Sequence, residues 1–203
     1  RNPYYPFVDS KGKQLPYIDK IKVNLANNKE MAATKAATGE ATWACRFLRA
    51  QDIPMYMKNQ SKENYKVNLY NRAVSSALSI QLNQSTKDDK LRPIFQNLNF
   101  RRALSVAIDR KNINNKVFYG EGVPMQATIL PTDSLYKEEW GQSYAKHNPE
   151  KAKEYLNEMG MQDTDGDGWR ETPDGEQFNP NLFYCNEANT PILELIRSNW
   201  EEI

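Results

Sequence analysis

Apolar residues recur with helical spacing in the stretch 99–131, around which the rest of the chain is organised. If residues 100–108 are helical, one apolar stripe results, formed by Phe100, Leu104, Ala107 and Ile108. Asp109 can then accept the first free amide hydrogens of a second helix. That helix carries Ile113, Val117 and Phe118 on its apolar face, and Gly120 provides its left-handed stop. The sequence therefore predicts a packed pair of helices here.

The same kind of pattern predicts further helices over residues 29–38, 52–58, 149–159 and 190–203. Asn28 is placed to cap the first of them and Gly39 to end it, while Pro54 stands at the start of the second. The last helix places on one face Ile192, Leu195, Ile196 and Trp200. It has no stop signal, and the chain does not begin with Met, so we expect a domain of a longer protein.

Period-two alternation or short apolar runs predict strands over residues 17–26, 41–47, 65–74 and 76–84. In the last strand, one face carries Leu78, Ile80 and Leu82. The other face carries Ala77, Ser79, Gln81 and Asn83. A strand with one apolar and one polar face suits the wall of a solvated cleft.

Helices alternate irregularly with strands, which indicates an α/β or α+β fold in which helices pack on a mixed β-sheet. The 203 residues fit a single domain over 1–203. Residues 1–16 are rich in Pro and Tyr, and we expect them to form an extended segment that leads into this domain. The stretch 163–178, DTDGDGWRETPDGEQF, predicts a hairpin between glycine turns.

The composition excludes several classes of partner. The chain has 27 basic and 26 acidic residues and a net charge of +1, which gives no reason to expect nucleic acid or an anionic membrane surface. Mean hydropathy is −0.82. No window approaches the about 18 apolar residues that a membrane helix needs. Cys45 and Cys185 match no metal or redox spacing, and two buried free thiols are favoured over a disulfide.

Three consecutive segments carry a resemblance to a known family: FRRALSVAIDR, NINNKVFYGEG and VPMQATILP. They resemble the most recognisable part of the family 5 extracytoplasmic solute-binding proteins, the oligopeptide, dipeptide and oligosaccharide receptors of bacterial ABC importers. The opening RNPYYPFVDSKGKQLPYIDKIKV and the later LNQSTKDDKLRPIFQNLNFRRALS are also similar to that family. The resemblance implies the second lobe of a two-lobe receptor of the periplasmic-binding-protein type II kind.

The resemblance also implies function, partners and location. It implies a non-catalytic lobe that binds an oligopeptide or oligosaccharide together with the first lobe of the same full-length protein. An ABC permease would be the partner, and the location would be extracytoplasmic, in a periplasm or as a cell-surface lipoprotein. The resemblance further implies that the family's carboxylate that anchors a peptide amino terminus would lie beyond the end of this chain, so we expect no residue here to have that role.

Four residues are candidates for ligand binding. They are Trp43 and Arg46 in the predicted strand 41–47, and Gln81 and Asn83 on the polar face of 76–84. A guanidinium, an indole face and amides suit recognition of either a peptide or a sugar. Each residue also has an ordinary interpretation, as a core Trp, a surface Arg or an edge amide.

The segment DTDGDG at 163–168 matches the start of a calcium loop, with Asp at positions one, three and five and Gly at six. Glu171 then falls at position nine and Asp174 at position twelve. Asp174 is shorter than the usual Glu, and Pro173 precludes an exiting helix, so a plain acidic turn is the alternative. The candidate metal ligands are Asp163, Asp165, Asp167 and Asp174, and we expect a bound calcium ion to be structural.

His147 is the only histidine, and its place beside Asn148-Pro149 at a helix start favours a capping or surface role over that of a base. Zinc ligands of the usual type are poorly supplied, and no glycine-rich phosphate loop follows a strand. We therefore expect no enzyme and no required cofactor. Two alternatives remain open: a carbohydrate-active enzyme domain with a calcium-stapled loop, and a ligand-binding sensor module.

Overall fold

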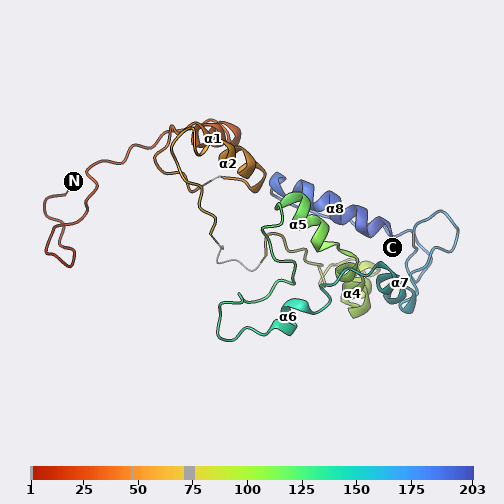
Figure 1. The fold of residues 1–203 in the computed structure, drawn as a ribbon. Coiled ribbons are helices and arrows are strands. Elements are labelled where there is room, and N and C mark those ends of the chain that lie inside the picture. Colours follow the sequence, from red (N-terminus) through yellow and green to blue (C-terminus); the bar gives the residue numbers. More distant parts are fainter. Residues whose placement is uncertain (1, 47, 71–75) are drawn as a thin grey trace. The chain divides into compact units, whose positions relative to one another are not determined.

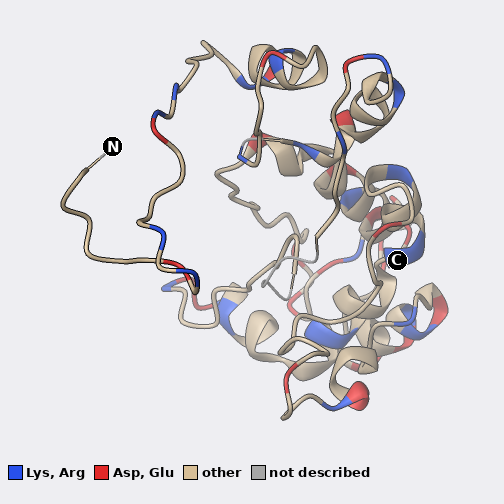
Figure 2. Cartoon of the chain, turned by 60° about the vertical axis from the view of Figure 1, so that its left-hand side comes forward, with Lys and Arg blue, Asp and Glu red and all other residues tan. Residues whose placement is uncertain are grey.

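The computed structural model describes residues 2–46, 48–70 and 76–203 (Figure 1). The chain divides into two compact units, Arg1–Leu69 and Tyr70–Ile203, and each is described by itself. Basic and acidic residues are interspersed along the chain, as its balanced charge leads one to expect (Figure 2). None of the helices in the described ranges combines the length and apolar character that crossing a membrane requires. The expected single domain over 1–203 stays a prediction.

The first unit contains two helices, α1 (Lys29–Ala37) and α2 (Ile53–Asn59), and the short 3₁₀ helix η1 (Ala50–Asp52). Both predicted helices are confirmed. The Asn28 side chain accepts a hydrogen bond from the Met31 amide at 2.8 Å, which is the expected N-cap. A small core of Ala33, Ala37 and Tyr56 joins α1 to α2.

Local polar contacts complete this unit. Arg49 Nε donates to Asp52 at 2.8 Å and its Nη1 donates to Glu30 at 2.6 Å, so one guanidinium links η1 to α1. Gly39 ends α1 with a φ of +72°, and a Cβ there would lie 3.2 Å from the Glu63 carbonyl oxygen. Both observations explain why glycine follows the helix.

The second unit is helical in its regular parts. Its elements are α3 (Leu91–Gln96), α4 (Leu98–Ala107), α5 (Arg110–Val117), α6 (Glu138–Gln142), α7 (Pro149–Glu158), η2 (Glu187–Asn189) and α8 (Thr190–Glu201). Helix α4 packs against α7, and α5 packs against α8 (Figure 1). The larger core consists of Ile94, Phe100, Ala103, Val106, Ala107, Ala152, Leu156 and Met161. A second cluster consists of Ile113, Ile192 and Ile196.

The predicted apolar stripe of α4 is correct in part. Phe100 and Ala107 are buried, but Leu104 is only half-buried. Ile108 lies just beyond the helix, where its ψ of 119° ends the helical turn, and it packs against the second cluster. Ala103, at 0% exposed, is more deeply buried than Leu104, because the close contact with α7 admits a small side chain best.

All four carbonyl groups at the end of α4 receive hydrogen bonds. Leu104 O accepts from Trp200 Nε1 at 3.0 Å, and Val106 O accepts from the Asn148 amide at 2.7 Å. Ser105 O accepts from Arg110 Nη1 at 2.8 Å, and the ring nitrogen Nδ1 of His147 lies 3.0 Å from Ala107 O. Helix ends leave such carbonyls without partners inside the helix. His147 therefore has a capping role.

The predicted mixed sheet is not confirmed. Regular backbone pairing in the described ranges consists of two isolated antiparallel bridges, Val8 with Gln14 and Glu171 with Gln177. Residues 17–26 are extended without a strand partner, and Ile21, Val23 and Leu25 are exposed. A strand needs a neighbour for its amide and carbonyl groups, so period-two alternation alone does not make a sheet. The predicted strands 41–47 and 65–74 include residues outside the described ones.

The two faces of segment 76–84 are nevertheless those expected. Leu78 and Ile80 pack against the cluster of α5 and α8, and Leu82 packs against the larger core. Ala77, Ser79, Gln81 and Asn83 are exposed. Alternation therefore predicted the burial of this segment, although the segment has no strand pairing.

The interpretation of both cysteines as buried was wrong. Cys45 and Cys185 are free thiols, and both are exposed. Both lie outside the helices and bridges, Cys185 at a bend, where little covers their side chains.

Candidate functional site

The four predicted ligand-binding residues are all exposed. Trp43, which is 81% exposed, and Arg46 belong to the first unit, whereas Gln81 and Asn83 belong to the second. Asn83 Oδ1 accepts a hydrogen bond from the Ser85 amide at 3.2 Å, so part of its polar capacity serves a local turn. A shared ligand site formed by these four residues stays a prediction.

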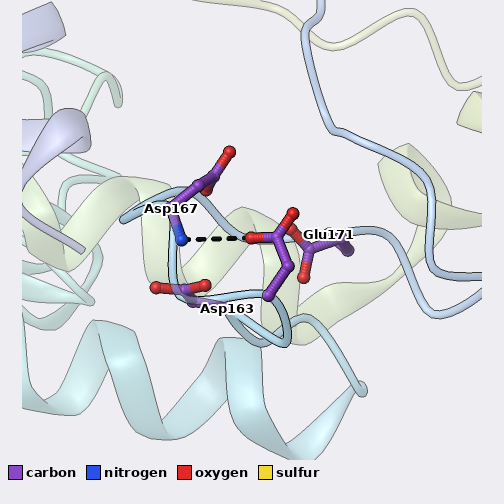
Figure 3. A group of neighbouring side chains, drawn as sticks. Asp163, Asp167 and Glu171 are labelled. Carbon is purple, nitrogen blue, oxygen red and sulfur yellow. Dashed lines mark hydrogen bonds between the residues drawn. The ribbon is translucent and has the colours of Figure 1, made fainter.

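The acidic loop brings together the first three predicted metal ligands. Asp163, Asp165, Asp167 and Glu171 each place one carboxylate oxygen within 4.8 Å of the others (Figure 3). Asp174 does not belong to this group. Glu171, at position nine of the loop, belongs to it instead. Hard cations such as Ca²⁺ prefer clustered oxygen ligands of this kind.

Hydrogen bonds within the loop hold these carboxylates. Asp163 accepts from the amides of Gly166, at 2.7 Å, and Gly168, at 3.0 Å. The Asp165 carboxylate accepts from the Asp167 amide at 3.1 Å (Figure 3). These are also the contacts that an acidic turn makes without any ion. The loop geometry therefore suits both interpretations.

Glu171 is the buried member of the acidic group, at 7% exposed. Its Oε2 accepts from the Thr164 hydroxyl at 2.6 Å and from the Thr164 amide at 2.7 Å. These bonds hold the pKa of the Glu171 carboxyl below its ordinary value, against the opposing effects of burial and of nearby Asp163. Glu171 is thus ionised at neutral pH and fixes the two ends of the loop.

A groove of about 220 Å³ lies on the second unit, and sequence patterns gave no signal of it. It is lined by Leu98, Arg101, Arg102, Ser105, Gln126 and Tyr144. Four of these residues come from α4, and the other two come from the loops on either side of α6. The Arg-Arg pair was visible in the sequence, but its neighbours Gln126 and Tyr144 are distant in the chain.

Ser105 is at the centre of the polar contacts beneath this groove. Its hydroxyl donates to Tyr144 O at 2.9 Å. The same oxygen accepts from Gln126 Nε2 at 2.5 Å and from Arg110 Nη2 at 3.0 Å. One serine side chain therefore fixes the loop that carries Tyr144 to the end of α4.

Tyr144 adopts a positive φ of 51°, which is uncommon for a residue other than glycine. Its carbonyl oxygen accepts from both Ser105 and Gln126, and these bonds hold the unusual backbone conformation in place. As a result its ring lies over the Arg102 guanidinium, with 5.0 Å between Cζ and the ring centroid.

The whole chain, residues 1–203, matches the family described as bacterial extracellular solute-binding proteins, family 5 Middle. It is 27% identical over 197 residues to the periplasmic alpha-galactoside-binding protein of Rhizobium meliloti (strain 1021), covering 87% of this chain and 26% of the relative. It is 25% identical over 189 residues to the oligopeptide-binding protein OppA of Bacillus subtilis (strain 168), covering 91% of this chain and 31% of that protein.

A solved structure of an oligopeptide-binding protein OppA has the same fold over 100% of this chain and 33% of its own length, at 30% identity and a TM-score of 0.69. This likeness agrees with the expected lobe of a type II periplasmic binding protein. The chain spans about a third or less of the length of the relatives it matches. Because the family match covers every residue, the chain belongs to the family 5 bacterial extracellular solute-binding proteins.

Proposed function

We propose that the whole protein captures an oligopeptide or an oligosaccharide outside the cytoplasm and presents it to an ABC permease. The observation that carries this proposal is the family match over residues 1–203. The names of the relatives support both ligand classes, since one binds alpha-galactosides and another binds oligopeptides. Two locations suit such a receptor: the periplasm, or the cell surface, where a lipid anchor would hold it.

In this proposal the present chain forms one wall of a cleft whose other wall belongs to the first lobe. Closure of two lobes over a solute buries most of its surface and relies on a few oriented polar contacts. The solute then shifts the equilibrium between open and closed forms by binding the closed form more tightly. No bond of the solute is made or broken, so the role is not enzymatic.

Trp43, Arg46, Gln81 and Asn83 are the proposed contacts to the solute from this chain. All are exposed, so none is needed for packing. Trp43 offers an aromatic face to a sugar ring or an apolar peptide side chain. The amides of Gln81 and Asn83 suit hydroxyl and peptide groups equally.

The test is a thermal-shift and calorimetric screen of the full-length protein against peptides and oligosaccharides, with product analysis of each mixture. A ligand that stabilises the protein and is recovered unchanged supports the receptor. Turnover of the ligand would support the carbohydrate-active enzyme instead. Trp43→Ala and Gln81→Ala should weaken binding, whereas the exposed controls Trp169→Ala and Gln142→Ala should not.

We further propose that the acidic loop takes a calcium ion with a structural role, held by Asp163, Asp165, Asp167 and Glu171. The supporting observation is the convergence of four carboxylates within 4.8 Å. Such an ion would join the two arms of the hairpin, because Glu171 also pairs with Gln177. Calorimetry with CaCl₂ on the metal-free chain tests it, and the absence of binding heat would leave the loop as an acidic turn.

A further inference from the structure

We infer that the groove lined by Leu98, Arg101, Arg102, Ser105, Gln126 and Tyr144 binds a carboxylate group that carries a short apolar stem. The inference rests on the groove alone and is independent of the transport role. None of these six residues belongs to the ligand contacts proposed above.

The first observation is uncompensated positive charge. Arg101, Arg102 and Arg110 gather around Ser105 on α4 and at the start of α5. Within the described part of the chain, none of the three forms an ion pair with a carboxylate, although Arg49, Arg92 and Arg197 do. Burial lowers the pKa of Arg110, whose guanidinium donates to Ser105 beneath the groove. A charge in such a place favours a counter-ion.

The second observation concerns free donors. Arg101 uses Nη1 for the protein, with bonds to Gln96 O at 2.7 Å and Phe95 O at 3.0 Å. Its Nε and Nη2 have no partner in the described ranges. Arg102 makes no hydrogen bond to the described residues, and its Nε is buried without a partner. Both arginines line the groove and retain N–H donors, and a single guanidinium group can bind a planar carboxylate through paired bonds.

The third observation is that the Arg102 side chain is already fixed in place before a ligand binds. The Tyr144 ring covers its guanidinium at 5.0 Å, and the unusual backbone of Tyr144 is fixed by Ser105 and Gln126. A long, flexible side chain that is already immobilised loses less entropy when it binds a ligand. The hydrogen bonds of Ser105 and Gln126 are used within the protein, so these two residues position the groove and leave the anion to the arginines.

Size and lining then define the ligand. About 220 Å³ is less than the roughly 300–1,000 Å³ of a site for a drug-sized molecule. The groove thus has room for a small acid or for the terminal group of a larger molecule. Leu98 and the Tyr144 ring give an apolar wall for the carbon atoms attached to a carboxylate, which inorganic phosphate lacks. A free small carboxylic acid and the carboxyl terminus of a peptide share this chemistry.

The experiment follows the arginine Nε–H signals of the 203-residue chain by ¹H–¹⁵N NMR. The buried Arg102 Nε–H should exchange slowly with water and give a visible peak. Sodium propionate at constant ionic strength should shift this peak with saturation, whereas neutral propionamide should not. A propionamide response equal to that of propionate would overturn the inference, and so would tighter binding of inorganic phosphate.

Matched variants and peptides complete the test. Arg102→Lys should weaken propionate binding about fivefold or more, because lysine lacks the fork that pairs with a carboxylate. Arg197→Lys, an exposed and ion-paired arginine on α8, should stay within about twofold of the parent. Unchanged affinity in Arg102→Lys would contradict the site. A tripeptide with a free carboxyl terminus is then compared with propionate. If the tripeptide binds more tightly and its amidated form does not, the natural ligand group is a peptide carboxyl terminus. If the tripeptide and propionate bind equally, the ligand is a free acid.

Discussion

Trp200 Nε1 donates a hydrogen bond of 3.0 Å to the backbone carbonyl of Leu104, and this bond joins the last helix of the chain to α4. The two residues are 96 positions apart. Asn199, next to Trp200, accepts from the Asp109 amide at 2.9 Å, so α8 contacts both the end of α4 and the start of α5. Helix α8 thus satisfies the backbone at the junction of the two central helices.

Replacing Trp200 should show how much its hydrogen bond to Leu104 contributes to stability. Trp200→Phe keeps an aromatic ring but removes the N–H together with the five-membered ring of the indole, so the Leu104 carbonyl loses its partner from α8 and some packing is lost. We expect the free energy of unfolding to fall by about 1–3 kcal/mol, measured by urea titration. Trp169→Phe, at an indole that is 51% exposed, is the matched control and should change little. Equal midpoints for the two variants would show that the bond contributes nothing.

The larger core should be sensitive at Phe100. This side chain is 3% exposed and packs edge-on against Phe178, with 5.5 Å between ring centroids. We expect Phe100→Ala to cost about 3–5 kcal/mol of stability in the same assay. Phe183 is 92% exposed, so Phe183→Ala is a control that removes the same atoms outside the core. If both variants unfold at the parental midpoint, the α4–α7 core is placed wrongly.

Low pH should lower the stability of the folded chain, because Glu171 becomes protonated. Its pKa is lowered in the folded state by the hydrogen bonds from Thr164. A lowered pKa contributes stability above the unfolded value, about 4.3 for Glu, and that stability is lost as pH falls through the folded pKa. Thr164→Val removes the hydroxyl donor and should flatten this acid dependence of unfolding, whereas Thr164→Ser should preserve it. Identical pH profiles for the two variants would rule out the hydroxyl as the cause.

Calcium binding should show whether Glu171 or Asp174 is the fourth ligand of the loop. Glu171 belongs to the group and Asp174 does not. By calorimetry, Glu171→Gln should lower calcium affinity about tenfold or more, whereas Asp174→Asn should leave it within about twofold. A larger loss of calcium affinity in Asp174→Asn than in Glu171→Gln would show that Asp174, at position twelve of the loop, is the ligand.

The reactivity of the two exposed thiols gives a simple check on the irregular segments that carry them. Cys45 and Cys185 are both free and exposed. Under native conditions both should react with a thiol reagent at close to the rate of an unfolded control, since access limits buried cysteines. Protection of either thiol until urea is added would mean that its segment is covered.

Helix positions were predictable because their signals are local. Asn28, Asp109 and Asn148 each accept an amide three residues ahead, and each starts the expected helix. Helix α3 was not predicted, since its six residues are too few for a periodic pattern and contain Pro93. The expected sheet is not confirmed, and strand pairing depends on a partner segment that no local pattern specifies.

The geometry of the candidate sites was likewise predictable only where it depends on residues close in sequence. Asp163, Asp165 and Asp167 lie within five residues and were predicted to converge, as they do. Glu171, and not Asp174, belongs to the carboxylate group; it pairs with Gln177 and accepts a hydrogen bond from Thr164. The groove around Arg102 and Tyr144 could not be predicted, because the Ser105 contacts that assemble it span 21 and 39 residues.

The central claim is that this chain is one wall of a two-lobe solute receptor. The most direct test is calorimetric titration of one ligand into the full-length protein and into residues 1–203 alone. We expect binding at about micromolar Kd for the full-length protein and at about millimolar Kd or weaker for the single chain, a loss of several kcal/mol. Near-equal affinity for the two would place the whole site within this chain and would contradict the two-lobe receptor.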